Sequence, residues 1–501
     1  MKNIKKMICF LIVTALLTVV FVSCAQDEGS GTPADPDSPG VVDDDDGEEP
    51  ANPRERYNPN FAPVDMGGYV FQIGTRDDSG VWHVGGVPIH TRDLFAEQMT
   101  GDLINDAVFR RNSYIEEKFN MRIEMITFPE SVSESLANEM VERSARAGDK
   151  SFDLLMTHMH IGFQTATRGV LHDLAAFPNI DLSKPYWNDG ATRGGSVGHR
   201  LFVGLSDLSF STNESLYCMF FNKNMLEDYA LENPYKLVQN NQWTFDTFNR
   251  MIRHTYLDLN GSGMIDIGDQ FGYASSSAVN FIWAGGSHIM TKDALDIPVL
   301  DFNTPRTLSV FNWALEMTNN PYTWAVDQWW IEGPLGIFQD GRALFYSSKL
   351  ERVNELRAVE FDFGIIPYPK YDSAQENFYS FVDGHASMMA IPILLPNPEW
   401  TGMIIEELSF LSFRDILPVY KDVVLGVKLV RDEESVEMLE ILFDSKVFDP
   451  SYVLGGGFWI MWFELIRGPN TDFVSTFERR EASLVRDIER RVELLLAVEE
   501  F

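Results

Sequence analysis

Oxygen-bearing residues recur at regular intervals in the segment DLNGSGMIDIGD, residues 258–269. They occupy the first, third, fifth, ninth and twelfth places, with a glycine at the sixth, and this is the spacing of a twelve-residue calcium loop. The seventh place adds a backbone carbonyl oxygen. The predicted ligands are Asp258, Asn260, Ser262, Met264 (through its carbonyl), Asp266 and Asp269. A metal-free turn is the alternative interpretation, because so short a motif also recurs by chance.

The residues after this loop indicate what a calcium ion would do there. An EF-hand switch needs a second helix after the loop, whereas QFGYASS, residues 270–276, has the pattern of a strand. Ser262 replaces the usual acid at the fifth place, and Asp269 is shorter than the usual glutamate at the twelfth. We therefore expect a structural calcium ion that binds weakly, with a dissociation constant on the order of 10⁻⁴ M.

Two histidines, His158 and His160, form a second pattern that metal ions favour. In a strand both side chains would point to the same side. A zinc site needs at least three protein ligands, however, and no third one lies near this pair in the sequence. A structural or surface role is therefore the preferred interpretation. The chain also has no His-Glu-x-x-His or Cys-x-x-Cys motif.

The N-terminal residues predict export. Three lysines within the first six residues precede an uncharged stretch, residues 7–22, which is shorter than the roughly 20 residues that span a bilayer. The cysteine that follows a small residue at its end resembles the lipobox of bacterial lipoproteins. This resemblance makes residues 1–23 a signal peptide and Cys24 the lipid-modified mature N-terminus. An uncleaved anchor or plain secretion is the alternative.

Composition separates a tether from a folded region. Residues 24–63 are rich in Pro, Gly, Asp and Glu, and we expect a disordered acidic tether there. The chain carries 74 Asp and Glu against 40 Lys and Arg, a net charge of −34, which argues against nucleic acid or an anionic lipid surface as a partner. The chain after residue 63 is too long for one comfortable core, so two lobes are expected.

Apolar spacing predicts a β-α-β-α-β order at the start of the folded region. The predicted elements are a strand at 69–73, a helix over 104–119 closed by Asn120, a strand at 121–125, a helix over 132–141 ended near Gly148, and a buried strand at 152–156. This order favours a largely parallel sheet covered by helices. Thr244 and Thr304 are predicted helix N-caps, and residues 477–495 have the apolar face of a long amphipathic helix.

Eight local sequences occur in a characteristic order from Gly68 onward: GYVFQIG, NDAVFRRNSYIEEKFNMRIEM, FDLLMT, MFFNKNMLED, WTFDTFNRMI, FNTPRTLSVFNWALEM, FQDGRALFYSS and FDFGIIPYPK. Together they resemble the extracellular solute-binding proteins of bacterial ABC importers, in the large carbohydrate-binding family. The resemblance implies an α/β fold of the type II periplasmic binding protein kind. In that fold two lobes, each a mixed sheet flanked by helices, are joined by hinge crossings and close on a ligand.

The same resemblance implies the course of the chain and its partners. Crossings near Ser211, Pro334 and Ile366 would divide the chain into an N-terminal lobe, residues 64–211 and 335–366, and a C-terminal lobe, residues 212–334 and 367–501. The protein would be a monomer and no enzyme. It would capture a carbohydrate, preferably an oligosaccharide, and pass it to ABC permease subunits, while its lipid alone holds it at the extracellular (or periplasmic) face of the cell membrane. Calcium-type loops serve several oligosaccharide binders of this family as structural clips.

A sugar cleft needs flat aromatic side chains for C–H faces and a few carboxylates for hydroxyl groups. The candidates are Trp283, Trp329, Trp330, Asp383 and Trp459. Each tryptophan has a core role as its alternative, and we expect that role for Trp243 and Trp313. A surface-anchored glycoside hydrolase, which needs two carboxylates across a cleft, and a carbohydrate adhesion protein are the alternative functions.

Overall fold

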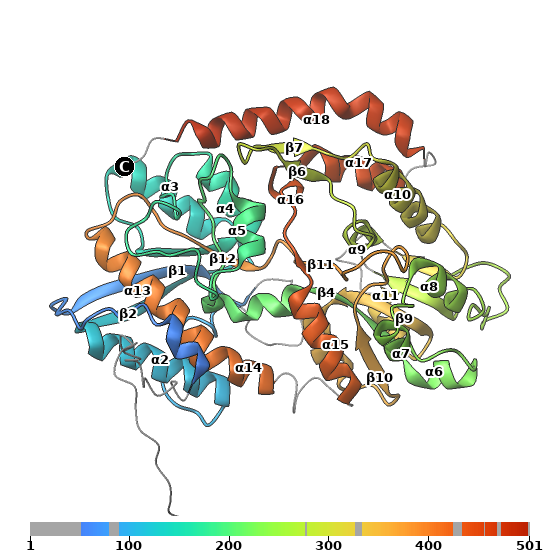
Figure 1. Ribbon diagram of the computed structural model, residues 1–501. Helices are drawn as coiled ribbons and strands as arrows, with labels where there is room; N and C mark the ends of the chain where they lie inside the picture. Colours follow the sequence, from blue (N-terminus) through green and yellow to red (C-terminus); the bar gives the residue numbers. More distant parts are fainter. Residues whose placement is uncertain are drawn as a thin grey trace, which may run out of the picture. The chain divides into compact units, whose positions relative to one another are not determined.

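Two larger sheets organise the fold (Figure 1). The computed structural model describes residues 52–79, 90–275, 278–325, 333–423, 433–454, 456–467 and 472–498. The first sheet has the strand order β12-β3-β1-β2, with β1 Tyr69–Arg76, β2 Met121–Phe128, β3 Leu154–His158 and β12 Ser387–Ala390. The second has the order β10-β4-β9-β5-β8, with β4 Tyr217–Asn222, β5 Phe271–Ser275, β8 Thr323–Ala325, β9 Ala343–Lys349 and β10 Phe363–Ile366.

The first sheet follows the predicted order. Strand β1 pairs in parallel with β2 along its whole length and with β3 on its other side. Helices α2 (Leu103–Phe119) and α3 (Leu136–Ala147) make the connections, and they end where Asn120 and Gly148 adopt left-handed φ angles of 46° and 76°. The predicted β-α-β-α-β unit and both helix ends are confirmed. Strand β12 joins antiparallel to β3, which makes the sheet mixed.

Strand membership corrects the predicted lobe boundaries. Residues 335–366, expected in the N-terminal lobe, supply β9 and β10, which pair with β4 of the second sheet. Residues 367–501 were expected in the C-terminal lobe. They include β12, which pairs with β3 of the first sheet, and helix α13 (Pro398–Leu411), which packs on α2. The crossing placed near Pro334 is wrong, because Pro334 lies between β8 and β9 of one sheet. The division into two lobes remains a prediction, and residues 50–501 form one compact unit that holds both sheets.

Two chain segments run side by side between the sheets. One is the 3-10 segment η2 (Asp207–Ser215), which leads into β4. The other, residues 382–386, connects strand β11 (Ser380–Phe381) to β12 and is called the crossing segment below. Val382 bridges Leu216, and the Asp383 amide donates to the Ser215 carbonyl at 3.0 Å. These backbone contacts fix the position of the crossing segment beside the start of β4.

The C-terminal helix α18 (Phe473–Leu496) packs its apolar side on α17 (Gly456–Arg467) and on strand β7 (Pro298–Leu300), which pairs with β6 (Met290–Lys292). The predicted amphipathic face is confirmed, because its apolar residues are buried: they include Phe477, Leu484, Ile488, Val492 and Leu495. Within the described ranges, none of the helices combines the length and apolar character needed to cross a membrane.

The remaining elements have the following bounds. The longer helices are α10 Pro305–Thr318 and α15 Glu433–Asp444. Shorter helices are α4 Met159–Ala166, α5 Asp189–Gly195, α6 Lys223–Asp228, α7 Pro234–Gln239, α8 Phe245–Ile252, α9 Phe281–Ala284, α11 Gly333–Gln339, α12 Val353–Leu356, α14 Leu417–Val423 and α16 Ser451–Leu454. The π-helical turn η5 spans Ser412–Ile416, strand β13 spans Lys446–Val447 beside β11, and η1, η3 and η4 span Pro53–Tyr57, Ala278–Asn280 and Leu350–Arg352.

Candidate functional site

Aromatic rings from separate parts of the chain gather beside the crossing segment. Trp283 of α9 stacks on Phe381 of β11 with ring centroids 3.9 Å apart and planes within 7°. Tyr452 of α16 lies 5.3 Å from Phe381 and 5.4 Å from Trp459 of α17, and Tyr217 of β4 stacks on Phe381 at 6.4 Å. These five residues are called the aromatic cluster. Two of them, Trp283 and Trp459, are predicted ligand residues, so the fold brings them together.

The two tryptophans of this cluster differ in what they offer a ligand. Trp283 is 1% exposed, and its indole N–H donates to Asp449 at 2.9 Å, so its prediction as an open platform is corrected to a packing role. Trp459 is half-buried, and among the described residues its indole Nε1 is buried without a hydrogen-bond acceptor. A buried indole N–H normally finds a partner. Trp459, which is the more exposed of the two, is therefore the better platform.

Asp383 of the crossing segment is buried next to this cluster. Its carboxylate accepts hydrogen bonds from the Tyr217 hydroxyl at 2.8 Å and from the amide and Nδ1 of His385 at 2.9 and 2.6 Å. Burial acts to raise the pKa of Asp383, but the neighbouring His385 and Lys349 and these hydrogen bonds hold it well below its usual range. Asp383 thus stays ionised and orients its neighbours.

Three other predicted residues lie outside the described residues. They are the ligand candidates Trp329 and Trp330 and the predicted lipidation site Cys24.

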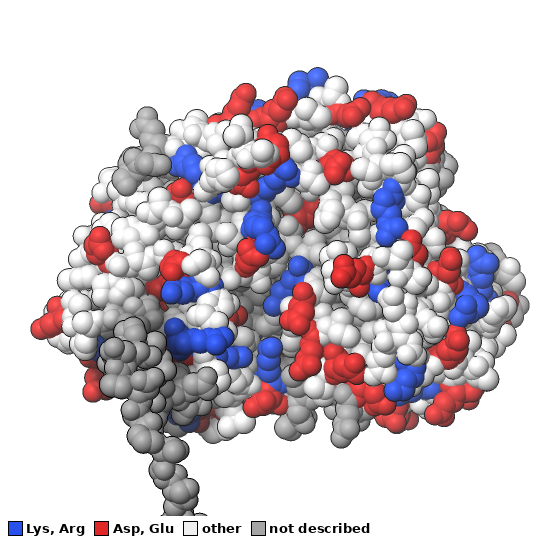
Figure 2. Space-filling model, viewed as in Figure 1, with Lys and Arg blue, Asp and Glu red and all other residues white. Residues whose placement is uncertain are grey.

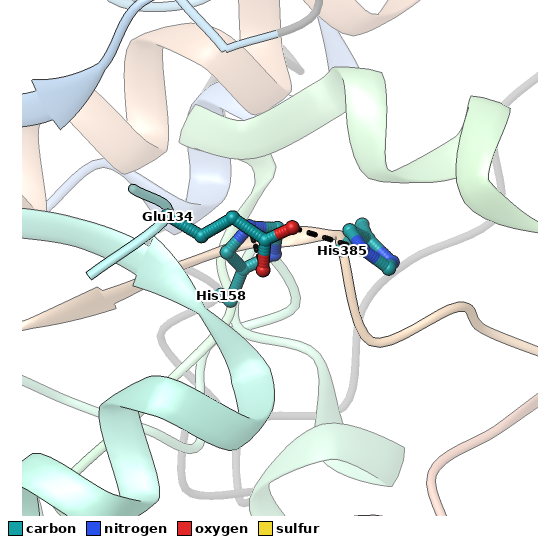
Figure 3. A group of neighbouring side chains, drawn as sticks. All are labelled: Glu134, His158 and His385. Atoms are coloured by element: carbon teal, nitrogen blue, oxygen red, sulfur yellow. Dashed lines mark ion pairs between the residues drawn. The ribbon is translucent and has the colours of Figure 1, made fainter. Parts of the chain in front are cut away.

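Glu134, His158 and His385 converge at the same place (Figure 3). One potential ligand atom from each lies within 4.8 Å of the others, and no other such group occurs in the described part of the chain. His158 Nε2 is 3.6 Å from Glu134 Oε2, and His385 Nε2 is 3.9 Å from Glu134 Oε1. The prediction that His158 has no third ligand nearby is therefore wrong. Sequence proximity missed it because Glu134 and His385 come from distant segments.

His160, the partner of His158 in the sequence pattern, does not belong to this trio. It lies in the first turn of α4, and its ring centroid is 5.6 Å from that of His158. Because β3 ends at His158, the two side chains do not share the face of a strand, as the sequence pattern assumed. Burial lowers the pKa of His160 to about 4, so its imidazole is neutral at physiological pH.

A buried ionic group surrounds the trio at the carboxyl ends of the parallel strands. Arg76 ends β1, and Glu130 follows β2. Glu130 Oε1 lies 3.2 Å from His158 Nε2 and 3.5 Å from Arg76, which also donates to the His385 carbonyl at 2.9 Å. Burial lowers the pKa of Arg76 to about 10, which still leaves it charged at neutral pH. Ligands of open α/β sheets bind at this edge, outside the carboxyl ends of the strands.

The predicted calcium loop has many of its oxygen-bearing residues in mutual contact. Asn260 donates to both carboxylate oxygens of Asp266 at 2.9 and 3.0 Å, and Ser262 donates to the Met264 carbonyl at 3.0 Å. The carboxylate of Asp258 accepts hydrogen bonds from backbone amides within the loop. The carboxylates of Asp258, Asp266 and Asp269 do not all come within 4.8 Å of one another. Strand β5 follows the loop, as predicted, so the EF-hand arrangement is excluded.

Asp269 provides the test of whether these residues fit a cation. It is fully buried, and its Oδ1 has no hydrogen-bond partner among the described residues. Its other oxygen accepts from Tyr256 and from the Asp266 amide, both at 3.1 Å. A buried carboxylate oxygen without a partner is costly. The donor set, all oxygen, and this unpaired atom fit a hard cation such as calcium.

Residues 194–198 match Gly-x-Ser-x-Gly, a hydrolase signature that bears on the enzyme alternative. In hydrolases the serine sits on a sharp turn from a strand into a helix. Ser196 instead follows the end of α5, and Lys292 donates to its hydroxyl at 2.8 Å. This serine does not have the geometry of a nucleophile elbow.

The surface charge agrees with the composition. Figure 2 shows acidic and basic side chains interspersed on the face in view, without a continuous basic patch there. A continuous basic surface is the electrostatic footprint of a nucleic-acid-binding protein. This face therefore gives no support to a nucleic-acid partner.

Comparison with known proteins places the chain among others of this architecture. A family model described as bacterial extracellular solute-binding protein matches residues 115–403, more than half of the chain. Similar solved structures include a cyclo/maltodextrin-binding protein complexed with maltotetraose, with 13% identity, a TM-score of 0.52, and coverage of 86% of this chain and 98% of that one. M. tuberculosis UspC is 12% identical, with a TM-score of 0.53, and the match covers 83% of this chain and 100% of that one. The GacH receptor of Streptomyces glaucescens is 10% identical, with a TM-score of 0.50, and the match covers 86% of this chain and 100% of that one. These likenesses confirm the predicted fold. No curated protein sequence matches the chain.

Proposed function

Because this chain belongs to the bacterial extracellular solute-binding proteins, we propose that it captures a carbohydrate outside the cytoplasm and passes it to the permease subunits of an ABC importer. The lipid on Cys24, the acidic tether and a monomeric state are parts of the same proposal. Binding without turnover is its central feature. A hinged protein of this kind closes on its ligand only to the extent that the ligand prefers the closed form.

The aromatic cluster is the observation that supports a carbohydrate ligand. Trp459 is half-buried within this cluster, and its indole Nε1 has no hydrogen-bond acceptor among the described residues. Sugars present C–H faces that stack on such rings and hydroxyl groups that accept from such donors. Asp383, which is ionised beside the cluster, fixes the orientation of Tyr217 through the 2.8 Å hydrogen bond from its hydroxyl.

A screen of neutral oligosaccharides is expected to find one that raises the melting temperature of the purified protein. A ligand at about 100 times its dissociation constant adds about 2.7 kcal/mol to the free energy of unfolding. The measurement is a thermal shift, followed by chromatography of the recovered sugar. Recovery of the sugar intact supports a binding protein, whereas shortened products would favour the glycoside hydrolase alternative.

We also propose that calcium binds the loop 258–269 as a structural ion. The ligands would be Asp258, Asn260, Ser262, the Met264 carbonyl, Asp266 and Asp269. The loop is a fixed part of the fold, because the guanidinium of Arg342 donates to the carbonyls of Ile267 and Asp269 at 2.7 Å and ties it to the start of β9. When bound, the ion supplies positive charge that offsets the repulsion of the loop carboxylates.

Chelation is expected to lower the melting temperature. At about 1 mM calcium and a dissociation constant on the order of 10⁻⁴ M, the ion adds about 1.4 kcal/mol to the free energy of unfolding. We expect Asp258→Asn to abolish the difference between calcium and chelator, and Asp149→Asn, at an exposed residue outside the loop, to leave it unchanged. Equal melting temperatures of the unaltered protein in calcium and in chelator would refute the assignment.

A further inference from the structure

We propose that Glu134, His158 and His385 bind a divalent transition-metal ion such as Zn²⁺. This inference goes beyond carbohydrate capture and does not depend on it. It also concerns a site separate from the calcium-type loop, whose ligands are all oxygen atoms. Imidazole nitrogens together with one carboxylate are the ligands that zinc and related ions prefer over calcium or magnesium.

The three side chains lie near one another, at distances somewhat longer than a tetrahedral centre requires. Two ligands that are each about 2.1 Å from a zinc ion lie about 3.4 Å apart at the tetrahedral angle. The nitrogen of His158 lies 3.6 Å from Glu134, and that of His385 lies 3.9 Å from Glu134. The two imidazole rings meet edge to face with centroids 4.7 Å apart. The three ligand atoms lie within 4.8 Å of one another, so a closure of up to about 1.4 Å would bring them to bonding distance from one ion.

His158 has a ring nitrogen available for such a bond. The side chain is fully buried, and neither of its nitrogens has a hydrogen bond among the described residues. Its 3.2 and 3.6 Å approaches to Glu130 and Glu134 are ion-pair distances without hydrogen-bond geometry. A buried imidazole nitrogen without a hydrogen-bond partner is available to bind a metal ion.

Asp383 positions the second imidazole. Its Oδ1 lies 2.6 Å from Nδ1 of His385, so Nδ1 carries the hydrogen and the lone pair of Nε2 faces Glu134. A carboxylate behind a metal-bound histidine is the usual outer-shell arrangement of zinc sites. The Tyr217 hydroxyl in turn holds the other oxygen of Asp383 at 2.8 Å. Asp383 is thus a positioning residue for the proposed ion.

The charge of the surroundings also favours a cation. Glu130, Glu134 and Asp383 supply three carboxylates, and Arg76 supplies one guanidinium within this group. Formally, the group carries two more negative than positive charges, and a divalent ion would balance them. Nearby Lys349 is paired with Glu351 at 2.6 Å. Because His158 ends β3 and His385 lies on the crossing segment, the ion would also tie that segment to the first sheet.

The test is a titration of the full chain, without an affinity tag, with Zn²⁺ by calorimetry and with Co²⁺ by its d–d absorption. We expect one equivalent of Zn²⁺ and the intense Co²⁺ bands of a tetrahedral centre. Glu134→Gln and His385→Ala are each expected to weaken Zn²⁺ binding about 100-fold or more, and Asp383→Asn about 10- to 100-fold. The first two side chains are partly exposed, so folding survives more readily than for a variant of the buried His158.

Matched controls separate this site from other sources of metal binding. Glu139→Gln and His254→Ala make the same kind of change at exposed residues outside the trio, and Asp258→Asn alters the calcium-type loop. We expect unchanged Zn²⁺ affinity in all three, with far-ultraviolet circular dichroism confirming the fold of every variant. Absence of Zn²⁺ binding to the unaltered protein, or full binding by folded Glu134→Gln and His385→Ala, would overturn the proposal. Neither result would bear on carbohydrate capture.

Discussion

Replacing Trp243 by alanine is expected to lower the free energy of unfolding by about 3–5 kcal/mol. Trp243 has no exposed surface, its ring lies 5.4 Å from Phe345 and 5.9 Å from Phe248, and its indole N–H donates to the Pro367 carbonyl at 2.9 Å. Alanine would leave a large cavity and an unpaired buried carbonyl, and both are costly. Trp243→Ala should therefore rank among the most destabilising single substitutions in this chain.

The same replacement at Trp459 should affect ligand affinity more than stability. Because Trp459 is half-buried, we expect a much smaller loss of stability. If its ring is the carbohydrate platform, its removal should cost about 2 kcal/mol of binding, or roughly 30-fold in affinity. Urea unfolding measures the loss of stability, and titration with the oligosaccharide from the screen measures the loss of affinity. An unchanged affinity of Trp459→Ala would remove this residue from the proposed site.

These two tryptophans illustrate how far the sequence could be interpreted. Helix caps and periodicity are local, so the predicted N-caps were confirmed: the Thr244 and Thr304 hydroxyls accept from the amides of Thr247 and Thr307. The core role predicted for Trp243 was also confirmed, although this residue lies just before the N-cap Thr244 and its adjacent residues are polar. The strand after the calcium-type loop could also be predicted, because residues 270–276 have the local pattern of a strand.

Features that depend on distant partners could not be predicted in this way. A buried strand has the same apolar pattern whichever sheet it joins, so the sheets that β9, β10 and β12 join could not be predicted. Trp283 was predicted to line the cleft, but the ring of Phe381 and the carboxylate of Asp449 contact it and it is buried. The trio of Glu134, His158 and His385 likewise depends on three separate segments. Only the His-x-His pattern gave a signal of it.

One buried acid, Glu406 of α13, is expected to make a contribution to the stability of the protein that is lost between about pH 4.5 and 7. This side chain is 1% exposed. Tyr186 donates to one of its oxygens at 2.6 Å, and Trp187 donates to the other at 3.1 Å. Burial raises the pKa of Glu406 from 4.5 to about 7, although both hydrogen bonds act to lower it. Its nearest acidic neighbour in sequence, Glu407, is paired with Lys118 at 2.8 Å.

The direction of the effect follows from proton binding in the two states. Below about pH 4.3 Glu406 is protonated whether the chain is folded or unfolded, and it adds no pH dependence. As the pH rises further, the unfolded chain releases this proton first, so unfolding becomes easier until the folded carboxyl also ionises near pH 7. The two pKa values correspond to a loss on the order of 3 kcal/mol across this window.

Glu406→Gln isolates this contribution, because glutamine keeps the shape of the side chain and does not titrate. The free energy of unfolding of the natural protein, minus that of Glu406→Gln, is expected to fall by on the order of 3 kcal/mol from pH 4.5 to 7.5. All other titrating groups cancel in this difference. Glu440→Gln, at an exposed residue of α15, should give a difference that stays constant with pH. A constant difference for Glu406→Gln as well, or one that rises with pH, would mean that Glu406 is already ionised in the folded protein, with the Tyr186 and Trp187 donors outweighing its burial.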